Sequence, residues 1–194
     1  KNSPKLVVDG TDLNTYSTGK GEDWADGGEE DSGDAFPFFP IVALNRIDAS
    51  RLLIATKRIY IGTDDVSGAL KDTIAFTDVS SANFDDDTSA VSFGSVPNPN
   101  LLLVGAGDAL YLSTTAAPGS LVQLKGYKGG KITAVPIRPD SAQVFYVADG
   151  TTVWRTVDAG VNWENIGESL AGVGFNQVRA IQFVSKDGLN ALLV

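Results

Sequence analysis

Apolar and polar residues alternate in short runs along this chain, and Gly, Asp, Asn or Pro bounds each run. Such runs, rich in β-branched side chains, predict β-strands. The clearest example is the segment 151–167, where two expected strands, 153–156 and 163–166, flank the turn 157–161. The sequence Asp158-Ala-Gly in this turn supplies the short polar side chain and the flexible backbone that a β-hairpin requires. The segment therefore predicts a hairpin.

The same pattern recurs along the chain at a nearly constant interval. Each copy has a polar turn, an apolar strand, a short turn, and then a strand; in the three copies that run to completion, this last strand carries an aromatic residue. The residues just before the apolar strand are separated by 49, 43 and 47 positions: Arg51, Asn100, Gln143 and Asn190. A period in the forties with four strands per unit is typical of the blades of a β-propeller.

Each repeat also contains candidates for the first and the last strand of a blade. Small and β-branched residues suit the innermost strand, where blades converge on the axis. The innermost strands are expected at residues 41–44, 90–93, 132–135 and 178–183, and the outermost strands at 73–77, 121–124 and 163–166.

The spacing Thr156-x-Asp158-x-Gly160-x-x-Trp163 resembles the Asp-box, or BNR repeat, of sialidase-like β-propellers. The resemblance implies that Thr156 and Asp158 bond the backbone of the turn, that Gly160 permits its conformation, and that Trp163 packs beneath it. These four residues would then serve folding rather than ligand binding. Degenerate copies of the box are expected at residues 16–24, 63–68 and 113–119.

The fold expected from these repeats is an all-β propeller of four-stranded antiparallel blades, with about four blades represented in one domain, 1–194. Residues 1–35 would end a preceding blade, blades would occupy about 36–80, 81–127 and 128–170, and residues 171–194 would begin the next. Since the sequence stops within an expected strand, we favour part of a ring of six to eight blades. A closed four-bladed ring and a β-sandwich are the alternatives, although sandwich strands would not recur at this period.

Composition narrows the chemistry that the chain can perform. Its 43% hydrophobic content and 21 glycines suit a soluble β-protein, and its net charge of −9 disfavours nucleic acid or an anionic membrane as partner. It contains no Cys and no His, which excludes disulfides, structural zinc sites and Ser-His-Asp triads within the chain. A bound metal would need oxygen ligands, as calcium does. No membrane-spanning run is present, and we expect an exported location: secreted, periplasmic or at the cell surface.

The acidic residues are densest at 22–34, where glycines separate them. This segment is either a solvated linker or a calcium-binding loop, and 85–87 is a second acidic turn. The neighbouring aromatic segment 36–40 either wedges between blades or offers a platform for sugars. The candidate calcium ligands are Asp26, Glu29, Glu30, Asp31 and Asp34.

No pair of catalytic carboxylates can be assigned from the sequence. Arg46 and Arg179 lie beside innermost-strand candidates, where they would either face the channel or form ion pairs between blades. The run Ile137-Arg-Pro139 has the wrong order for the Arg-Ile-Pro motif of sialidases. We therefore expect a non-catalytic propeller that binds a protein or a carbohydrate, and the alternative is part of a sialidase- or xyloglucanase-like glycoside hydrolase. An assembly factor is a third hypothesis. A buried carboxylate pair near Arg46, Val91 and Arg179 would favour the enzyme.

Overall fold

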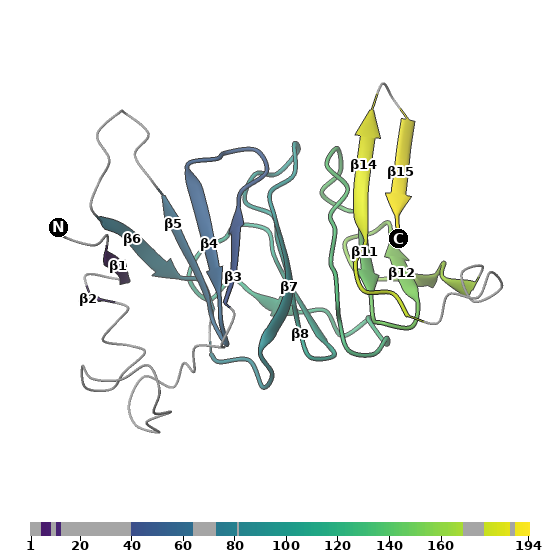
Figure 1. Cartoon of the computed structure of the whole chain (residues 1–194), viewed down its shortest axis with the longest axis horizontal. Helices are drawn as coiled ribbons and strands as arrows, with labels where there is room; N and C mark the ends of the chain where they lie inside the picture. The colour runs from purple at the N-terminus through teal and green to yellow at the C-terminus, as the bar shows by residue number, and fades with distance from the viewer. Residues whose placement is uncertain are drawn as a thin grey trace.

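The computed structural model describes residues 5–8, 11–12, 40–63, 73–80, 82–168, 177–186 and 189–194. The elements within these ranges are β-strands (Figure 1), which confirms the all-β class. Their bounds are β1 (Lys5–Val8), β2 (Thr11–Asp12), β3 (Ile41–Leu44), β4 (Arg51–Ala55), β5 (Ile59–Thr63), β6 (Thr73–Asp78), β7 (Thr88–Phe93), β8 (Leu102–Ala106), β9 (Ala109–Ser113), β10 (Val122–Gln123), β11 (Phe145–Ala148), β12 (Val153–Thr156), β13 (Glu164–Asn165), β14 (Gln182–Lys186) and β15 (Leu189–Leu193).

The first two blades are four-stranded antiparallel sheets whose strands are consecutive in sequence. In the first blade β3 pairs with β4, β4 with β5, and β5 with β6. In the second blade β7, β8, β9 and β10 follow the same order. The strands coincide with the runs predicted from hydrophobic alternation, within one to three residues at their ends. These repeated four-stranded sheets confirm the blade architecture of a β-propeller.

The N-terminal strands differ from the sequence-based prediction. Residues 1–35 were expected to end a preceding blade, but β1 pairs in parallel with β6, and β2 pairs antiparallel with β1. The described part of the N-terminal segment therefore extends the first blade to a six-stranded sheet. Local alternation identifies β1 as a strand but carries no information about its distant partner.

The third blade has an irregular innermost strand. Its regular sheet contains β11, β12 and β13, and the expected strand 132–135 contributes only the isolated bridges from Ala134 to Ala148 and from Ile137 to Phe145. Pro136 stands between these two bridges and has no N–H to donate, which interrupts the regular ladder. The hairpin at 151–167 is confirmed, since β12 and β13 pair through Trp154 with Asn165 and Arg155 with Glu164.

The last two strands form a hairpin that begins later than predicted. The innermost candidate 178–183 becomes strand only at β14, from Gln182 onward. The preceding residues are bonded to the third blade: the Val178 amide donates to the Gly150 carbonyl at 2.9 Å, and the Thr133 hydroxyl donates to the Val178 carbonyl at 3.2 Å. These contacts hold the segment against its neighbour before the strand starts.

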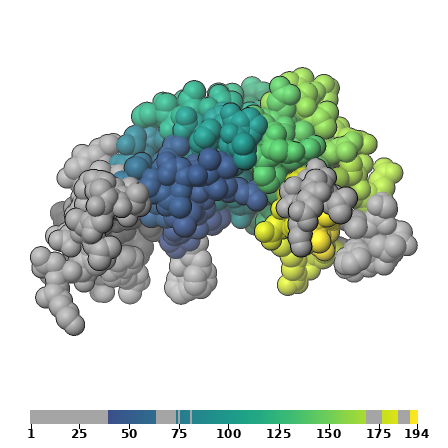
Figure 2. Space-filling view, turned by 90° about the horizontal axis from the view of Figure 1, so that it is seen from above, coloured from purple at the N-terminus to yellow at the C-terminus, as the bar shows by residue number. Residues whose placement is uncertain are grey.

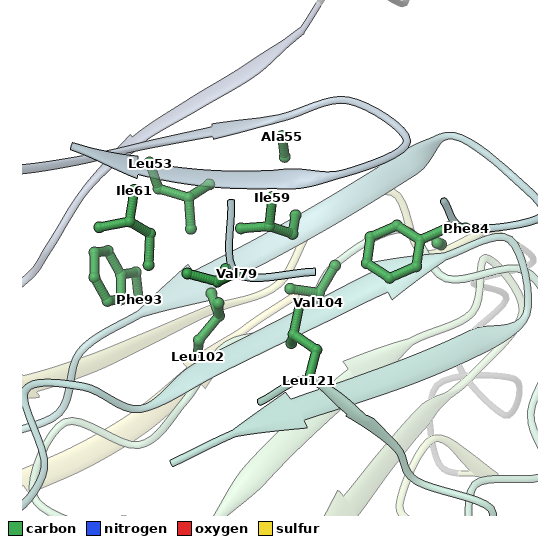
Figure 3. Close-up of a cluster of buried hydrophobic side chains, with 11 residues drawn as sticks. Leu53, Ala55, Ile59, Ile61, Val79, Phe84, Phe93, Leu102, Val104 and Leu121 are labelled. Carbon is green, nitrogen blue, oxygen red and sulfur yellow. The ribbon is translucent and has the colours of Figure 1, made fainter. Parts of the chain in front are cut away.

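The blades pack face to face around an arc, which Figure 2 follows from blue through teal and green to yellow. One buried cluster lies between the first and second blades, where Leu53 and Ile59 meet Phe93 and Leu102 (Figure 3). A second cluster joins the second and third blades through side chains such as Leu103 and Phe145, and a smaller one joins the third blade to the C-terminal hairpin. Within the described ranges, no helix is long and apolar enough to cross a membrane.

Candidate functional site: the axial cavity and the supporting turns

The innermost strands of the blades converge on a cavity of about 450 Å³. Each of the four innermost-strand candidates contributes to its lining, so the prediction that these segments share the axis is confirmed. A volume of this size lies within the range of small-ligand sites. The lining residues are Ile41, Ala43, Leu44, Arg46, Ser89, Ala90, Val91, Ser92, Phe93, Thr133, Ala134, Val135, Pro136, Ile181, Gln182 and Phe183.

Arg46 brings the cationic charge to this cavity. It follows β3, and its backbone amide donates to the Phe93 carbonyl of the second blade at 3.0 Å. Its guanidinium Nη1 donates to the Ile137 carbonyl of the third blade at 3.2 Å. The side chain was expected either to face the channel or to pair with an acid between blades. It does face the cavity, and its recorded partner there is a backbone carbonyl.

Hydroxyl groups supply much of the remaining polarity of the cavity. The Ser89 hydroxyl donates to the Gly105 carbonyl at 3.2 Å, beside a register shift in β7. The Thr133 hydroxyl lies within hydrogen-bond distance of the carbonyls of Ala148 and Val178. No carboxylate is present among the described residues that line the cavity.

Arg179, the second arginine expected at the channel, is not among the residues that line the cavity. Its guanidinium donates twice to Gln177 Oε1, at 3.0 and 2.9 Å. The structure therefore places Arg46 and Val91 in the lining but does not bring Arg179 to them. In the run Ile137–Pro139, Ile137 forms the bridge to Phe145 and its carbonyl accepts from Arg46, while Arg138 forms an ion pair with Asp140 in the turn that follows.

The turn after β12 has a dense network of hydrogen bonds around Asp158. Asp158 Oδ1 accepts from the Asn162 amide at 2.9 Å and from the Thr156 hydroxyl at 2.8 Å, and Oδ2 accepts from Asn162 Nδ2 at 2.7 Å. The pKa of Asp158 lies below its ordinary value because Asn162 and Thr156 donate to the ionised carboxylate. These contacts tie the carboxylate to its own hairpin.

Thr156, Gly160 and Trp163 complete the same turn. Thr156 Oγ1 accepts from the Gly160 amide at 3.0 Å, and Trp163 Nε1 donates to the Gly160 carbonyl at 3.0 Å. Gly160 has a φ of 90°, and a Cβ atom there would lie 2.6 Å from Leu124 Cδ1, so a larger residue would be both strained and crowded. Trp163 packs against the Tyr127 ring, with centroids 5.5 Å apart.

The second blade contains a related turn at the position where a degenerate box was expected. Ser113 Oγ accepts from the amides of Thr115 and Ala116, at 3.3 and 2.9 Å. Ala116 has a φ of 51°, and Ala159 in the third blade has a φ of 58°. Ala116 is the third residue after Ser113, and Ala159 is the third residue after Thr156. The two turns therefore share a left-handed residue at the same position, although only the turn of the third blade retains the Asp.

Asp149 is a buried acid that the sequence analysis did not single out. Its Oδ2 accepts from Trp154 Nε1 at 2.9 Å and from the Gly130 amide at 3.1 Å, while Oδ1 accepts from Thr151 and Thr152. Burial raises the pKa of this carboxyl, but the hydrogen bonds from Trp154, Gly130 and Thr151 outweigh that effect and lower it to about 2. The Asp-Gly dipeptide at 149–150 predicts a turn. It does not predict the hydrogen bond to Gly130, because Gly130 lies nineteen residues earlier in the sequence.

The proposed calcium ligands Asp26, Glu29, Glu30, Asp31 and Asp34 lie outside the described residues, as do the degenerate boxes at 16–24 and most of 63–68. The aromatic segment 36–40 is described only at Pro40. Asp85, Asp86 and Asp87 are exposed. Among the described residues no group of three or more acids could hold a metal ion. Calcium binding by the acidic segment stays a prediction.

Comparison with known proteins gives little further information. No protein-family model and no curated protein matches the chain. Among solved structures, an ancestral GH74 enzyme matches with a TM-score of 0.46 and 15% sequence identity. The match covers 65% of this chain and 18% of that enzyme, so the chain spans less than a fifth of its length. We base no assignment on a similarity of this size.

Proposed function

We propose that this chain is a non-catalytic binding propeller of the Asp-box type, exported or exposed at the cell surface, whose partner is a protein or a carbohydrate. The observation that carries the proposal is the composition of the axial cavity. Its described lining combines apolar and hydroxyl side chains with Arg46 and Gln182 and contains no carboxylate. Glycoside hydrolysis ordinarily requires two carboxyl groups beside the bond that breaks.

The turn at residues 156–163 supports the Asp-box assignment within this proposal. Its hydroxyl, carboxylate and indole groups bond the turn itself, as the family resemblance implies. Asp158 makes its described hydrogen bonds within its own hairpin, which suits a folding role. The repeat with a left-handed alanine at Ala116 suits a degenerate copy of the same device.

The second candidate is part of a glycoside hydrolase, in a propeller of six to eight blades. The cavity favours it in one respect, because about 450 Å³ at the axis offers room for sugar residues. The proposal of a larger ring is also supported by exposed apolar side chains that do not line the cavity, such as Val42 on the first blade, which is 59% exposed. Such side chains on an inner strand suit a face that a further blade covers.

The two functions are separated by measuring binding and turnover on the same glycans. The purified chain would be applied to an immobilised panel of polysaccharides, and reducing-end release from the same polysaccharides would be followed in solution. We expect that any glycan bound is retained without new reducing ends. Sustained release of reducing ends would refute the non-catalytic proposal and support the hydrolase.

Variants then locate a bound ligand. Arg46→Gln removes the charge from the cavity, and Arg138→Gln is the matched control because Arg138 is outside the lining and pairs with Asp140. If the ligand binds in the axial cavity, Arg46→Gln should lower its affinity and Arg138→Gln should not. Equal effects of the two variants would remove the cavity as the site.

A further inference from the structure

A second cavity, of about 460 Å³, lies between the start of β9 and the segment that follows β10. It shares no lining residue with the axial cavity. Its charged lining groups are Lys125, Lys128 and Asp108, and both lysines are exposed. The remaining lining residues are Ala109, Leu110, Gln123, Leu124, Tyr127 and Gly129.

The segment that forms most of this cavity is richer in cationic residues than the chain as a whole. The chain has a net charge of −9, yet residues 109–139 contain no Asp or Glu. The cationic residues of this stretch are Lys125, Lys128, Lys131 and Arg138. Lys125 and Lys128 attract an anion to their side of the cavity, although the Asp108 and Asp149 carboxylates nearby reduce this attraction. Salt screens the more distant negative charges of the chain over about 8 Å at physiological ionic strength.

The loop that carries the two lysines is held from beneath by a buried network. Tyr127 is 7% exposed, and its hydroxyl donates to the Gly130 carbonyl at 3.2 Å. The Gly130 amide donates to Asp149, which also accepts from Trp154. The Tyr127 ring contacts the rings of Trp154 and Trp163 edge to face. Binding at a loop fixed in this way costs little conformational entropy.

The mixture of groups in the lining favours a sugar that carries a negative charge. Two ammonium groups suit a carboxylate or sulfate, while the Asp108 carboxylate and the Gln123 amide can accept hydrogen bonds from sugar hydroxyls. The net charge of −9 opposes a partner with a large anionic footprint, which favours a short acidic saccharide over a long polyanion. Apolar side chains such as Leu110 and Leu124 offer contacts to the CH groups of a pyranose ring.

We propose that the cavity beside Lys125 and Lys128 is a binding site for an acidic sugar residue, in which the two ammonium groups bind the anionic substituent and Asp108 and Gln123 bind hydroxyls. The site is independent of the axial cavity and of the function proposed for it.

Isothermal titration calorimetry at 150 mM salt tests the site with four probes of similar length. The probes are a galacturonic acid hexamer, a sulfated heparin-derived hexasaccharide, neutral maltohexaose and hexaglutamate. We expect at least one acidic saccharide to bind at least tenfold more tightly than both maltohexaose and hexaglutamate. The tighter of the two acidic saccharides then shows whether the site prefers a carboxylate or a sulfate group. Hexaglutamate binding as tightly as the saccharides, or no binding of either acidic saccharide, would overturn the proposal.

The double variant Lys125→Gln/Lys128→Gln should weaken this binding at least tenfold. Lys131→Gln is the matched control, since Lys131 is exposed on the same segment but does not line the cavity, and it should change the affinity less than threefold. Circular dichroism would verify that both variants fold. An equal loss in the control, or a loss caused by Arg46→Gln and not by the double variant, would overturn the assignment.

Discussion

Replacing Asp149 by Asn tests whether the network beneath the third blade stabilises the fold. Asp149 is 8% exposed, and each of its carboxylate oxygens accepts from at least two donors. The side-chain amide of Asn has one oxygen and one NH2 group. In either orientation its NH2 group would face donors, which are Gly130 and Trp154 on one side and Thr151 and Thr152 on the other. Asp149→Asn therefore keeps the shape of the side chain but replaces two accepted hydrogen bonds with opposed donors.

The hydrogen bonds to Asp149 set the size of the effect, which can be expressed in two ways. Loss of two hydrogen bonds to a charged group, at roughly 1.5 kcal/mol each, gives about 3 kcal/mol. The lowering of the Asp149 pKa from 3.8 to about 2 corresponds to at most roughly 2 kcal/mol, at about 1.36 kcal/mol per pKa unit, because solvent screens part of the interaction. We expect Asp149→Asn to lower the free energy of unfolding by about 2 to 3 kcal/mol at pH 7, which in a chain of this length lowers Tm by about 4 to 12 °C.

The pH dependence provides a sharper test of the same reasoning. Because the folded-state pKa is depressed, the stabilisation from Asp149 is fully present above pH 3.8 and is lost as pH falls toward about 2. The difference between wild type and Asp149→Asn should therefore shrink over this window. Urea denaturation followed by tryptophan fluorescence at pH 7, 4, 3 and 2 measures it.

Asp140→Asn is the control for this experiment. Asp140 is hydrogen-bonded as well, to Arg138, but its carboxylate is exposed and its loss should have little effect on stability. A difference between wild type and Asp149→Asn that is below about 1 kcal/mol at pH 7, or that stays constant down to pH 2, would refute the role assigned to Asp149.

Three further predictions concern the turns and the acidic segment. Ala159→Gly should raise stability by about 0.5 kcal/mol because it relieves a left-handed φ, whereas Ala148→Gly in β11 should lower it; thermal melting compares the two. Asp158→Ala should lower Tm without changing ligand affinity, and an unchanged Tm would contradict its structural role. Calcium at millimolar concentration should raise Tm if the acids at 22–34 bind it, an effect that Asp31→Asn should reduce; no shift would remove this site.

The sequence allowed much of the fold to be predicted because its information is local. Alternation located strands such as β4 and β9, and the period in the forties placed the innermost strands at one axis. The features that were missed depend on distant or non-repetitive contacts. The parallel pairing of β1 with β6 joins segments more than sixty residues apart, and Pro136 replaces an expected ladder with two bridges.

The candidate sites were less predictable than the fold, for a related reason. The channel was one of the two positions predicted for Arg46, because the strand before it could be placed. The cavity beside Lys125 and Lys128 arises where the end of one blade meets a turn of the same blade, and no periodic pattern marks it. Asp149 resembled an ordinary turn residue, since its partners Gly130 and Trp154 are revealed only by packing.

The attachment of β1 to β6 has a consequence for the order in which the protein folds. Strands within each blade are neighbours in sequence, so their pairing closes short loops and is entropically inexpensive. The pairing of Lys5 with Thr73 closes a much longer loop and needs β6 to be in place first. We therefore expect the blades to form before β1 docks, so that during synthesis β1 leaves the ribosome before β6 but reaches its native position after it.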